Sequence, residues 1–246
     1  MIISFFEEFP TKKNLDKIKF VKFPTKLYVA AKSLKEFCEI KKQIKSKYIK
    51  EVIYWPILKN GEGYWLSPWT KRKALKRTIN DVRNMNVLWD AELPRKKRRL
   101  LTEMHNFFRN KKDIQNFFKS HKKDVYVAEY LIVDGIMKNF MGFFGLNFDP
   151  KKYNNKIVKM VYSSMHDFGE QIIKYEFEKG VKDYGDSFLV ALGTTAVGKL
   201  GTEPKIKPSL LKRDLKLAKN NGVKEVIIFR LGGLNKKYLD VFSEFL

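Results

Sequence analysis

Eight short apolar segments recur along the chain, and each except the last is followed by a longer, mostly lysine-rich stretch. The apolar segments cover residues 2–8, 27–31, 51–57, 86–92, 124–130, 157–164, 187–195 and 225–233. Apolar runs of this length that alternate with helix-like stretches predict βα units, whose strands pair in parallel. Eight such units in 246 residues predict a (β/α)8 barrel formed by one domain, residues 1–246. Functional groups in such a barrel lie at the carboxyl ends of the strands.

Capping signals place helices between these strands. Ser33 and Glu36 predict a capping box at the start of the second helix, in which the serine oxygen accepts from the Glu36 amide. Ser67 followed by Pro68 predicts that the third helix begins there. We therefore expect regular helices after the second and third strands.

Other helices are predicted with different degrees of regularity. Pro208 and Gly222 predict the first turn and the end of the seventh helix. Apolar residues at helical spacing follow the fourth strand, and we expect a break near Asn110. The first crossover, residues 9–25, shows little apolar periodicity, which predicts a short or distorted first helix.

The run 131–148 is the most apolar part of the chain. Asp134, Lys138 and Asn139 interrupt it, and it falls short of the ~20 uninterrupted apolar residues that a membrane span requires. It therefore predicts a buried or pocket-covering helix.

Acidic residues stand at the predicted ends of several strands. Asp90 and Glu92 are two residues apart and should project from the same face of the fourth strand. Glu129 holds the matching position on the fifth strand, and Glu7 or Glu8 does so on the first. Crowded carboxyls push their pKa values apart, which suits acid and base catalysis of the kind that glycoside hydrolysis uses. Alternatively, individual acids form structural salt bridges or cap the following turn.

Aromatic residues are predicted near the same strand ends. Trp55 closes the third strand, and Tyr64 and Trp65 lie in the loop that follows it. Flat apolar faces beside acids suit sugar rings, which stack on aromatic side chains while their hydroxyls bond carboxylates. Packing within the core is the alternative.

The loop after the seventh strand and the end of the eighth strand offer a second kind of site. Gly198, Gly201 and Glu203 lie in that loop, and Arg230 ends the eighth strand. Loops at these positions form phosphate-binding sites in many barrels, and glycines allow close approach of the backbone. The alternative is a flexible hinge of a lid.

His166 is the one histidine predicted at a strand end. It could polarise a substrate oxygen or bind a metal. The chain has no His-x-His pair and a single cysteine. We therefore predict no metal or other cofactor, with a divalent ion held by carboxylates and His166 as the alternative.

The chain is strongly basic, with 50 Lys+Arg against 27 Asp+Glu and a formal net charge of +23. One interpretation is that the lysines solvate the outer faces of the helices. The other is that the cluster 94–99, with Arg109, Lys111 and Lys112, contacts nucleic acid or an anionic surface. No zinc-finger, RNP-type or helix-turn-helix motif accompanies the charge, so this prediction rests on electrostatics.

The first residues, 1–10, reach Glu7 before any basic residue. This pattern favours a first strand over a secretion signal, so we expect a cytoplasmic location. We expect a small-molecule partner, a sugar or sugar phosphate, and no membrane partner. The sequence does not indicate the oligomeric state.

With Trp-Asp-Ala-Glu at 89–92, Glu129, and Gly-Tyr-Trp at 63–65, the chain resembles the TIM-barrel glycoside-hydrolase-like proteins. The resemblance implies a catalytic acid on the fourth strand and a second carboxylate on a later one. Those positions correspond here to Glu92 with either Glu129 or Glu203.

Three hypotheses follow. The first is an intracellular carbohydrate-active enzyme that hydrolyses or rearranges a sugar through Glu92 and Glu129, with Asp90 tuning them. The second is a sugar-phosphate isomerase or lyase in which the glycine loop and Arg230 hold the phosphate and Glu203 is the base. The third is a non-catalytic basic barrel that binds nucleic acid.

Overall fold

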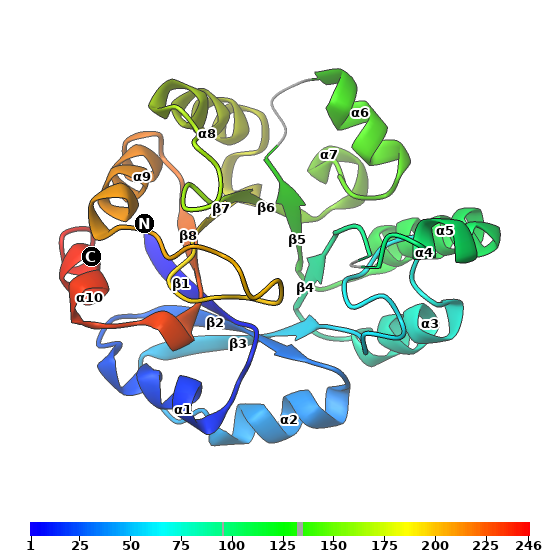
Figure 1. The fold of residues 1–246 in the computed structure, drawn as a ribbon, viewed down its shortest axis with the longest axis horizontal. Helices are drawn as coiled ribbons and strands as arrows, with labels where there is room; N and C mark the ends of the chain where they lie inside the picture. Colours follow the sequence, from blue (N-terminus) through cyan, green and yellow to red (C-terminus); the bar gives the residue numbers. More distant parts are fainter. Residues whose placement is uncertain (95, 132–134) are drawn as a thin grey trace. The chain divides into compact units, whose positions relative to one another are not determined.

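The structure is a computed structural model, and it describes residues 1–94, 96–131 and 135–246. Among these residues, eight parallel strands form a closed barrel in sequence order (Figure 1). The predicted fold class, a (β/α)8 barrel, is therefore confirmed. The strands are β1 (Ile2–Glu7), β2 (Thr25–Ala31), β3 (Ile49–Pro56), β4 (Val87–Asp90), β5 (Val125–Tyr130), β6 (Lys156–Val161), β7 (Phe188–Gly193) and β8 (Glu225–Phe229).

Helices separate the strands. The α-helices are α1 (Lys12–Leu15), α2 (Leu34–Gln43), α3 (Arg72–Asp81), α4 (Arg99–Thr102), α5 (Met104–Ser120), α6 (Gly135–Phe143), α7 (Pro150–Tyr153), α8 (Glu170–Tyr184), α9 (Pro208–Asn220) and α10 (Lys236–Ser243). Short 3-10 segments are η1 (Asp16–Phe20), η2 (Gly185–Ser187) and η3 (Leu231–Gly233). The first crossover holds only α1 and η1, as its weak periodicity predicted.

The chain forms two compact units. The first contains residues 1–30, 39–52 and 159–246, and the second contains residues 31–38 and 53–158. The organisation of residues 1–246 as a single domain stays a prediction.

In the first unit, β1 pairs with β2 and β8, and β7 pairs with β8. Phe5 packs its ring against Phe242 of α10, with the centroids 5.8 Å apart. The neighbouring Ser4 therefore points to the face away from the helices. There it donates to Glu225 over 2.8 Å, and Tyr28 donates to the same carboxylate over 2.9 Å. A buried polar cluster thus fills the strand beginnings.

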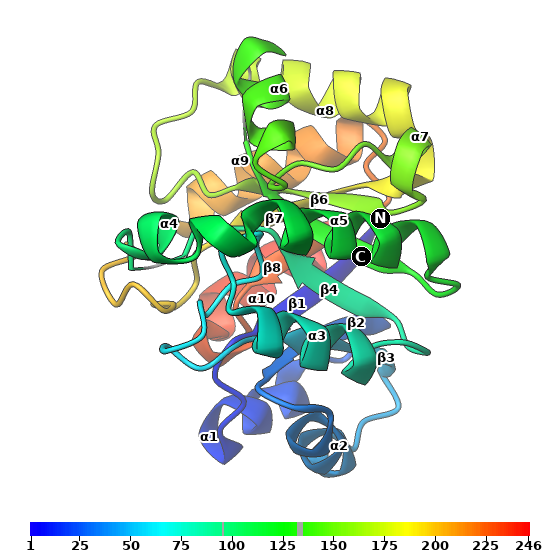
Figure 2. The ribbon, with the colours of Figure 1, turned by 90° about the vertical axis from the view of Figure 1, so that its right-hand side faces the viewer.

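In the second unit, β4 pairs with β3 and β5. The Trp89 ring packs on Phe117 and Phe118 of α5, at 5.3 Å from each centroid. Helices α3 and α5 lie side by side on this part of the sheet (Figures 1 and 2). The large rings of α5 therefore cover the helix-facing side of β4.

The capping box of α2 forms, while the predicted start of α3 is wrong. Glu36 N donates to Ser33 Oγ over 3.2 Å, and the Glu36 carboxylate accepts from Lys32 N over 2.8 Å. Helix α3 begins only at Arg72. Ser67 instead closes a turn, because its carbonyl accepts from Thr70 N over 2.9 Å.

Pro208 opens α9 at its first turn, as predicted, and the helix ends at Asn220. Gly222 follows with a φ of +79°, a left-handed conformation that favours glycine. Both ends of this helix are therefore set by residues that the sequence identified.

The predicted break at Asn110 is wrong, because α5 is continuous there. Asn110 is buried and donates to Pro68 O over 2.9 Å and to Thr70 O over 2.7 Å. Its side-chain oxygen accepts from Arg72 over 3.2 Å. A polar residue thus stays inside the helix because it holds the loop before α3.

Of the two expectations for the run 131–148, the buried helix is wrong, and the pocket-covering helix stays a prediction. Helix α6 has no buried residue, and Asp134 lies outside the described residues. No helix in the described ranges is both long enough and apolar enough to cross a bilayer.

Asn110→Ala is expected to lower the free energy of unfolding by about 3 kcal/mol, because the carbonyls of Pro68 and Thr70 lose their side-chain donor and Arg72 keeps only its ion pair with Asp113. Urea unfolding followed by circular dichroism measures the change. Asn116→Ala, at an exposed position of the same helix, is the matched control and should stay within about 0.5 kcal/mol. Equal midpoints for the two variants would contradict the anchoring role.

Candidate functional site

The register of β4 and β5 determines which acids share a face. Trp89 pairs with Val127, and Asp90 pairs with Ala128. Paired residues of parallel strands point to the same face, and successive residues alternate. Because Trp89 faces α5, Asp90 faces away from the helices, and Tyr130 shares its face. Glu129 lies on the helix-facing side, so the structure does not bring it together with Asp90.

Glu92 follows the end of β4 and is partly buried. Its Oε2 accepts from the Tyr130 hydroxyl over 2.7 Å. Its carboxyl also makes a hydrogen-bonding contact with that of Asp90, which is almost fully buried. Asp90, Glu92 and Tyr130 thus form one group, which we call the acid cluster. The sequence analysis missed Tyr130, because its face depends on the pairing of Asp90 with Ala128, which no local pattern contains.

Burial raises the pKa of Glu92, and its hydrogen bonds with Tyr130 and Asp90 oppose this effect only in part. Burial also raises the pKa of Tyr130, and the Glu92 charge adds to that increase. The tyrosine hydroxyl therefore stays protonated and donates. A carboxyl with a raised pKa at the end of a barrel strand is suited to give a proton to a bound ligand.

Glu129 has a different set of partners. Asn147 Nδ2 donates to one carboxylate oxygen over 2.7 Å, and Phe148 N donates to the other over 2.6 Å. The Phe148 ring packs on Phe118 of α5 at 4.5 Å between centroids. Glu129, which is fully buried, therefore fixes the loop between α6 and α7 against the helix layer. Asn147 is a second residue that the sequence analysis missed.

The aromatic loop after β3 lies beside the acid cluster. Leu66 N donates to Asp90 O over 3.1 Å, which ties this loop to the last residue of β4. Trp65 is partly exposed, and its ring meets the Tyr64 ring edge-on, at 5.3 Å and 87°. Tyr64 and Trp55 are almost fully buried. Of Trp55, Tyr64 and Trp65, Trp65 is therefore the one that is partly exposed.

Glu7 and Arg230 pair with each other in the first unit. Arg230 Nη1 donates to Glu7 over 2.9 Å, and Gly232 N donates to the second carboxylate oxygen over 2.7 Å. Burial raises the pKa of Glu7, while the Arg230 charge acts in the opposite direction. Glu7 shares the helix-facing side with Phe5, whereas Glu8 is buried on the other face. The Glu7–Arg230 pair has the geometry of a structural salt bridge.

The loop after β7 has packing reasons for its glycines. A Cβ at Gly198 would lie 2.7 Å from the Phe229 ring and 2.9 Å from Glu203 Oε1. Gly201 has a φ of +80°, a left-handed conformation that favours glycine. Glu203 accepts from Leu200 N over 2.9 Å and so closes the loop on itself. The phosphate-binding role of this loop stays a prediction.

His166 is exposed in the turn after β6, with its ring 5.3 Å from that of Phe168. Across residues 1–94, 96–131 and 135–246, no three histidine, cysteine or acidic side chains gather in a way that could hold a metal ion. Among the described residues, His166 is therefore not part of a group that could bind a metal ion.

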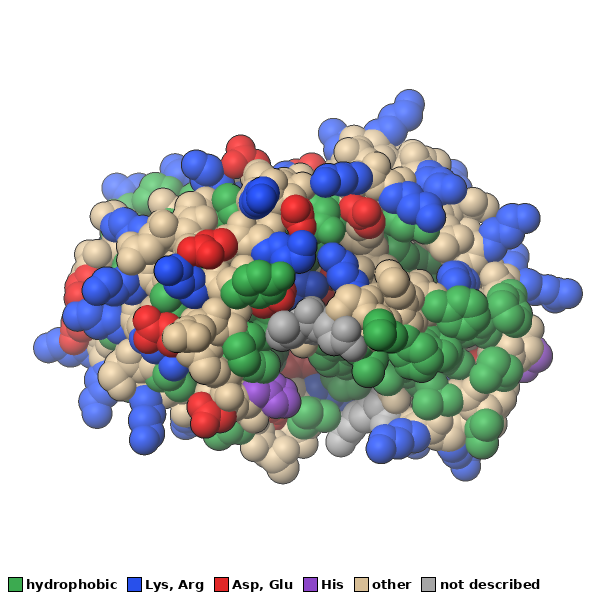
Figure 3. Space-filling view, turned by 90° about the horizontal axis from the view of Figure 1, so that it is seen from above, with side chains coloured by type: hydrophobic (Ala, Val, Ile, Leu, Met, Phe, Trp, Pro, Cys, Tyr) green, Lys and Arg blue, Asp and Glu red, His purple; other side chains and the backbone are tan. Residues whose placement is uncertain are grey.

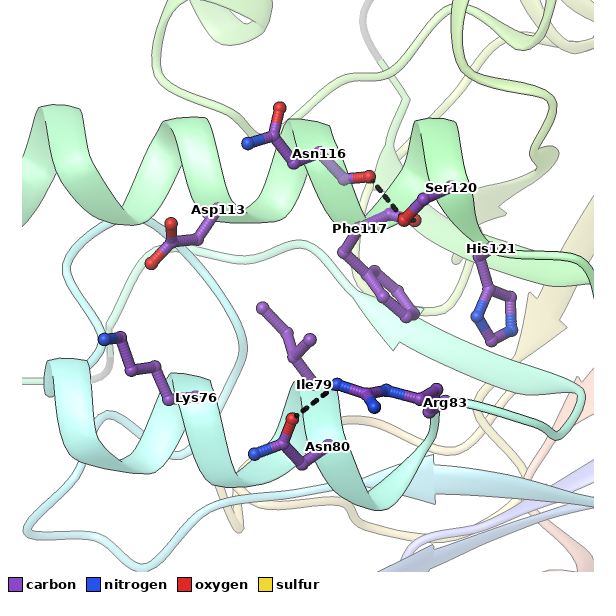
Figure 4. A pocket seen from close by; sticks show the side chains of 9 residues that line it. All are labelled: Lys76, Ile79, Asn80, Arg83, Asp113, Asn116, Phe117, Ser120 and His121. Carbon is purple, nitrogen blue, oxygen red and sulfur yellow. Dashed lines mark hydrogen bonds between the residues drawn. The ribbon is translucent and has the colours of Figure 1, made fainter.

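A cavity of about 400 Å³ lies between α3 and α5 (Figure 4). His121 at the end of α5 is one of its lining residues, so the cavity lies toward the start of β5 and away from the strand ends. None of the predicted site residues lines it. Its lining residues are Lys76, Ile79, Asn80, Arg83, Asp113, Asn116, Phe117, Ser120 and His121.

No protein-family model matches the sequence, and no curated protein matches it significantly. The glycoside hydrolase domain of PgaB from Bordetella bronchiseptica is similar in structure, with a TM-score of 0.56 and 11% identity over 98% of this chain and 96% of that one. A class V chitinase from Pseudomonas fluorescens Pf-5 gives 0.55 and 8%, over 98% of each chain. A xylose isomerase domain protein from Planctomyces limnophilus gives 0.54 and 10%, over 100% and 94%.

At such low identity these likenesses show the fold. They confirm, at that level, the resemblance to TIM-barrel glycoside-hydrolase-like proteins.

Glu129→Gln is expected to lower the free energy of unfolding by about 2 kcal/mol, because an amide nitrogen replaces one of the two acceptor oxygens of a buried anchor. Glu92→Gln is the matched control, since an amide resembles the protonated carboxyl, and it should change stability by less than about 1 kcal/mol. Thermal unfolding of both variants measures the difference. A larger loss for Glu92→Gln than for Glu129→Gln would contradict these two assignments.

Proposed function

We propose that this protein is a carbohydrate-active enzyme in which Glu92 is the general acid. The observation that carries the proposal is the acid cluster, where a carboxyl with a raised pKa at the end of β4 is hydrogen-bonded to a buried aspartate and a tyrosine. The structural neighbours named above as a glycoside hydrolase domain and a chitinase support this choice of substrate class. We call this proposed activity sugar hydrolysis.

Each member of the acid cluster has a role in a proton transfer. Burial disfavours the charged form of Glu92 and raises its pKa, which favours the proton-bearing form that a general acid needs. It gives that proton to the glycosidic oxygen as the bond to the leaving sugar breaks. The Tyr130 hydroxyl then donates to the carboxylate that remains. Asp90 positions the Glu92 carboxyl and tunes its pKa.

The second group of the hydrolysis must lie elsewhere. Acid and nucleophile in a retaining enzyme stand about 5 Å apart, and inverting pairs stand about 6.5–9.5 Å apart. Asp90 is too close for either arrangement, because its carboxyl is in hydrogen-bonding contact with Glu92. Glu129 is on the other face of β5. The attacking group is therefore another carboxylate with its water, or the 2-acetamido group of the sugar in a substrate-assisted reaction.

Trp65 supplies the stacking surface. Its ring stands edge-on to Tyr64, and the backbone of the next residue, Leu66, is bonded to Asp90. A sugar ring on the open face of Trp65 would have its hydroxyls and glycosidic oxygen close to the acid cluster. Substrate recognition then depends on the loop after β3, and proton transfer depends on the end of β4.

The alternative functions have less support. A phosphate site needs a free cation, whereas Arg230 is held by Glu7 and also donates to Val197 O over 3.0 Å. A nucleic-acid interface rests on charge alone, and Arg95 of the cluster 94–99 lies outside the described residues. Sugar rearrangement, suggested by the xylose isomerase neighbour, needs the same acid but no leaving group.

Glu92→Gln is expected to reduce hydrolysis of oligosaccharides by at least about 100-fold, because their alcohol leaving groups need a proton. The same variant should keep most of its activity on 4-nitrophenyl glycosides, whose leaving group departs without one. Sugar release from a panel of 2-hydroxy and 2-acetamido substrates measures both effects. Glu62→Gln, on the surface of the neighbouring loop, is the control. Full activity of Glu92→Gln on the oligosaccharides would refute the assignment.

Tyr130→Phe is expected to move the alkaline limb of kcat/KM to higher pH. The acid is active while protonated, so the rate falls as pH rises through its pKa. The Tyr130 hydrogen bond lowers that pKa, so its loss raises the pKa further. A pH–rate profile on an oligosaccharide measures the shift. An unmoved limb, or one moved to lower pH, would contradict the role of Tyr130.

A further inference from the structure

Helix α6 is apolar, and although Met141 packs partly buried against Trp69 and Phe107, none of its residues is fully buried. Ile136 is 81% exposed, Phe140 54% and Phe143 52%. In a space-filling view, apolar side chains gather where α6 lies, with lysine and arginine around them (Figure 3). A helix of this composition normally packs its apolar side chains against something, so the feature points to a contact outside the chain.

Helices α4 and α5 extend the same surface. Leu101 of α4 is exposed, and so are Met104 and Phe108 of α5, which are four residues apart and share one side of that helix. Phe107 contacts the rings of both Phe108, at 5.1 Å, and Phe143, at 6.2 Å. These contacts make one continuous surface, which we call the apolar surface. Its residues are Leu101, Met104, Phe108, Ile136, Met137, Phe140 and Phe143.

The charges beside the apolar surface are positive. Lys111 Nζ lies 4.4 Å from the Phe143 ring centroid, and Arg109 and Lys112 are exposed on the same helix. The two acids within residues 99–120, all of which the structure describes, are ion-paired, since Glu103 lies 3.5 Å from Arg99 and Asp113 lies 3.0 Å from Arg72. Residues 96–98 add three exposed bases. A partner that covers this surface must therefore accept apolar side chains and carry negative charge.

We infer that the apolar surface docks on an anionic lipid surface. Protruding phenylalanine and leucine side chains enter the boundary between headgroups and acyl chains, while lysine and arginine contact anionic headgroups. A second copy of the chain fits less well, because it would bring two positive surfaces together. This inference departs from the expectation that the protein has no membrane partner, and it does not depend on the proposed sugar hydrolysis.

Vesicle co-sedimentation tests the inference with the whole protein. The protein should pellet with phosphatidylcholine vesicles that contain about one third phosphatidylserine, and much less with phosphatidylcholine alone. Phe108→Ser with Phe140→Ser should raise the lipid concentration for half-binding about 10-fold or more, because two inserted rings are lost. The charge variant Arg109→Glu with Lys112→Glu should weaken binding to the anionic vesicles in the same direction.

Ile172→Ser with Tyr175→Ser is the matched control, since both residues are exposed apolar side chains on α8. This variant should bind like the wild type. Circular dichroism checks that all variants are folded. The inference fails if the wild type does not bind anionic vesicles at low salt, or if the Phe108 and Phe140 variant binds as well as the wild type. It also fails if gel filtration shows a dimer that the same variant dissociates, because a second copy then covers the surface.

Discussion

The register between β4 and β5 is the constraint on which the candidate site depends. Asp90 pairs with Ala128, so alternation places Asp90 and Tyr130 on one face and Glu129 on the other. A shift of one residue would exchange these faces and bring Glu129 toward Asp90. The register is held because Trp89 packs on the rings of α5. Core packing on one side of the sheet thus selects the acids that meet on the other side.

The loop after β3 is held in place by β4 and α5, the elements that also set the faces of the acids. Leu66 bonds to the end of β4, while Asn110 of α5 holds the carbonyls of Pro68 and Thr70. Trp65 therefore sits in a loop that is anchored from the strand and from the helix. This explains why an aromatic side chain can stay partly exposed in a fixed position, which a stacking surface requires.

The sequence predicted the barrel, because periodic strands and caps such as Ser33 and Pro208 are local signals. It did not predict which acids meet. Glu129 follows β4 in the linear pattern as a plausible partner, but its face depends on a one-residue register that no local pattern contains. Asn110 likewise resembles a helix break by type, and only its contacts with a distant loop explain why the helix continues. The exposure of α6 also had no local signal, since apolar composition usually means burial.

The net charge of +23 would favour ionised carboxyls throughout the molecule. Glu62 follows that direction, because Arg77 donates to it and lowers its pKa. Glu92 shows the opposite shift within the same unit, since burial is its largest influence. Surface charges are screened over about 10 Å at 0.1 M salt, whereas the loss of water around a buried carboxyl is not. A basic protein can therefore raise the pKa of one glutamate when it removes water from that side chain.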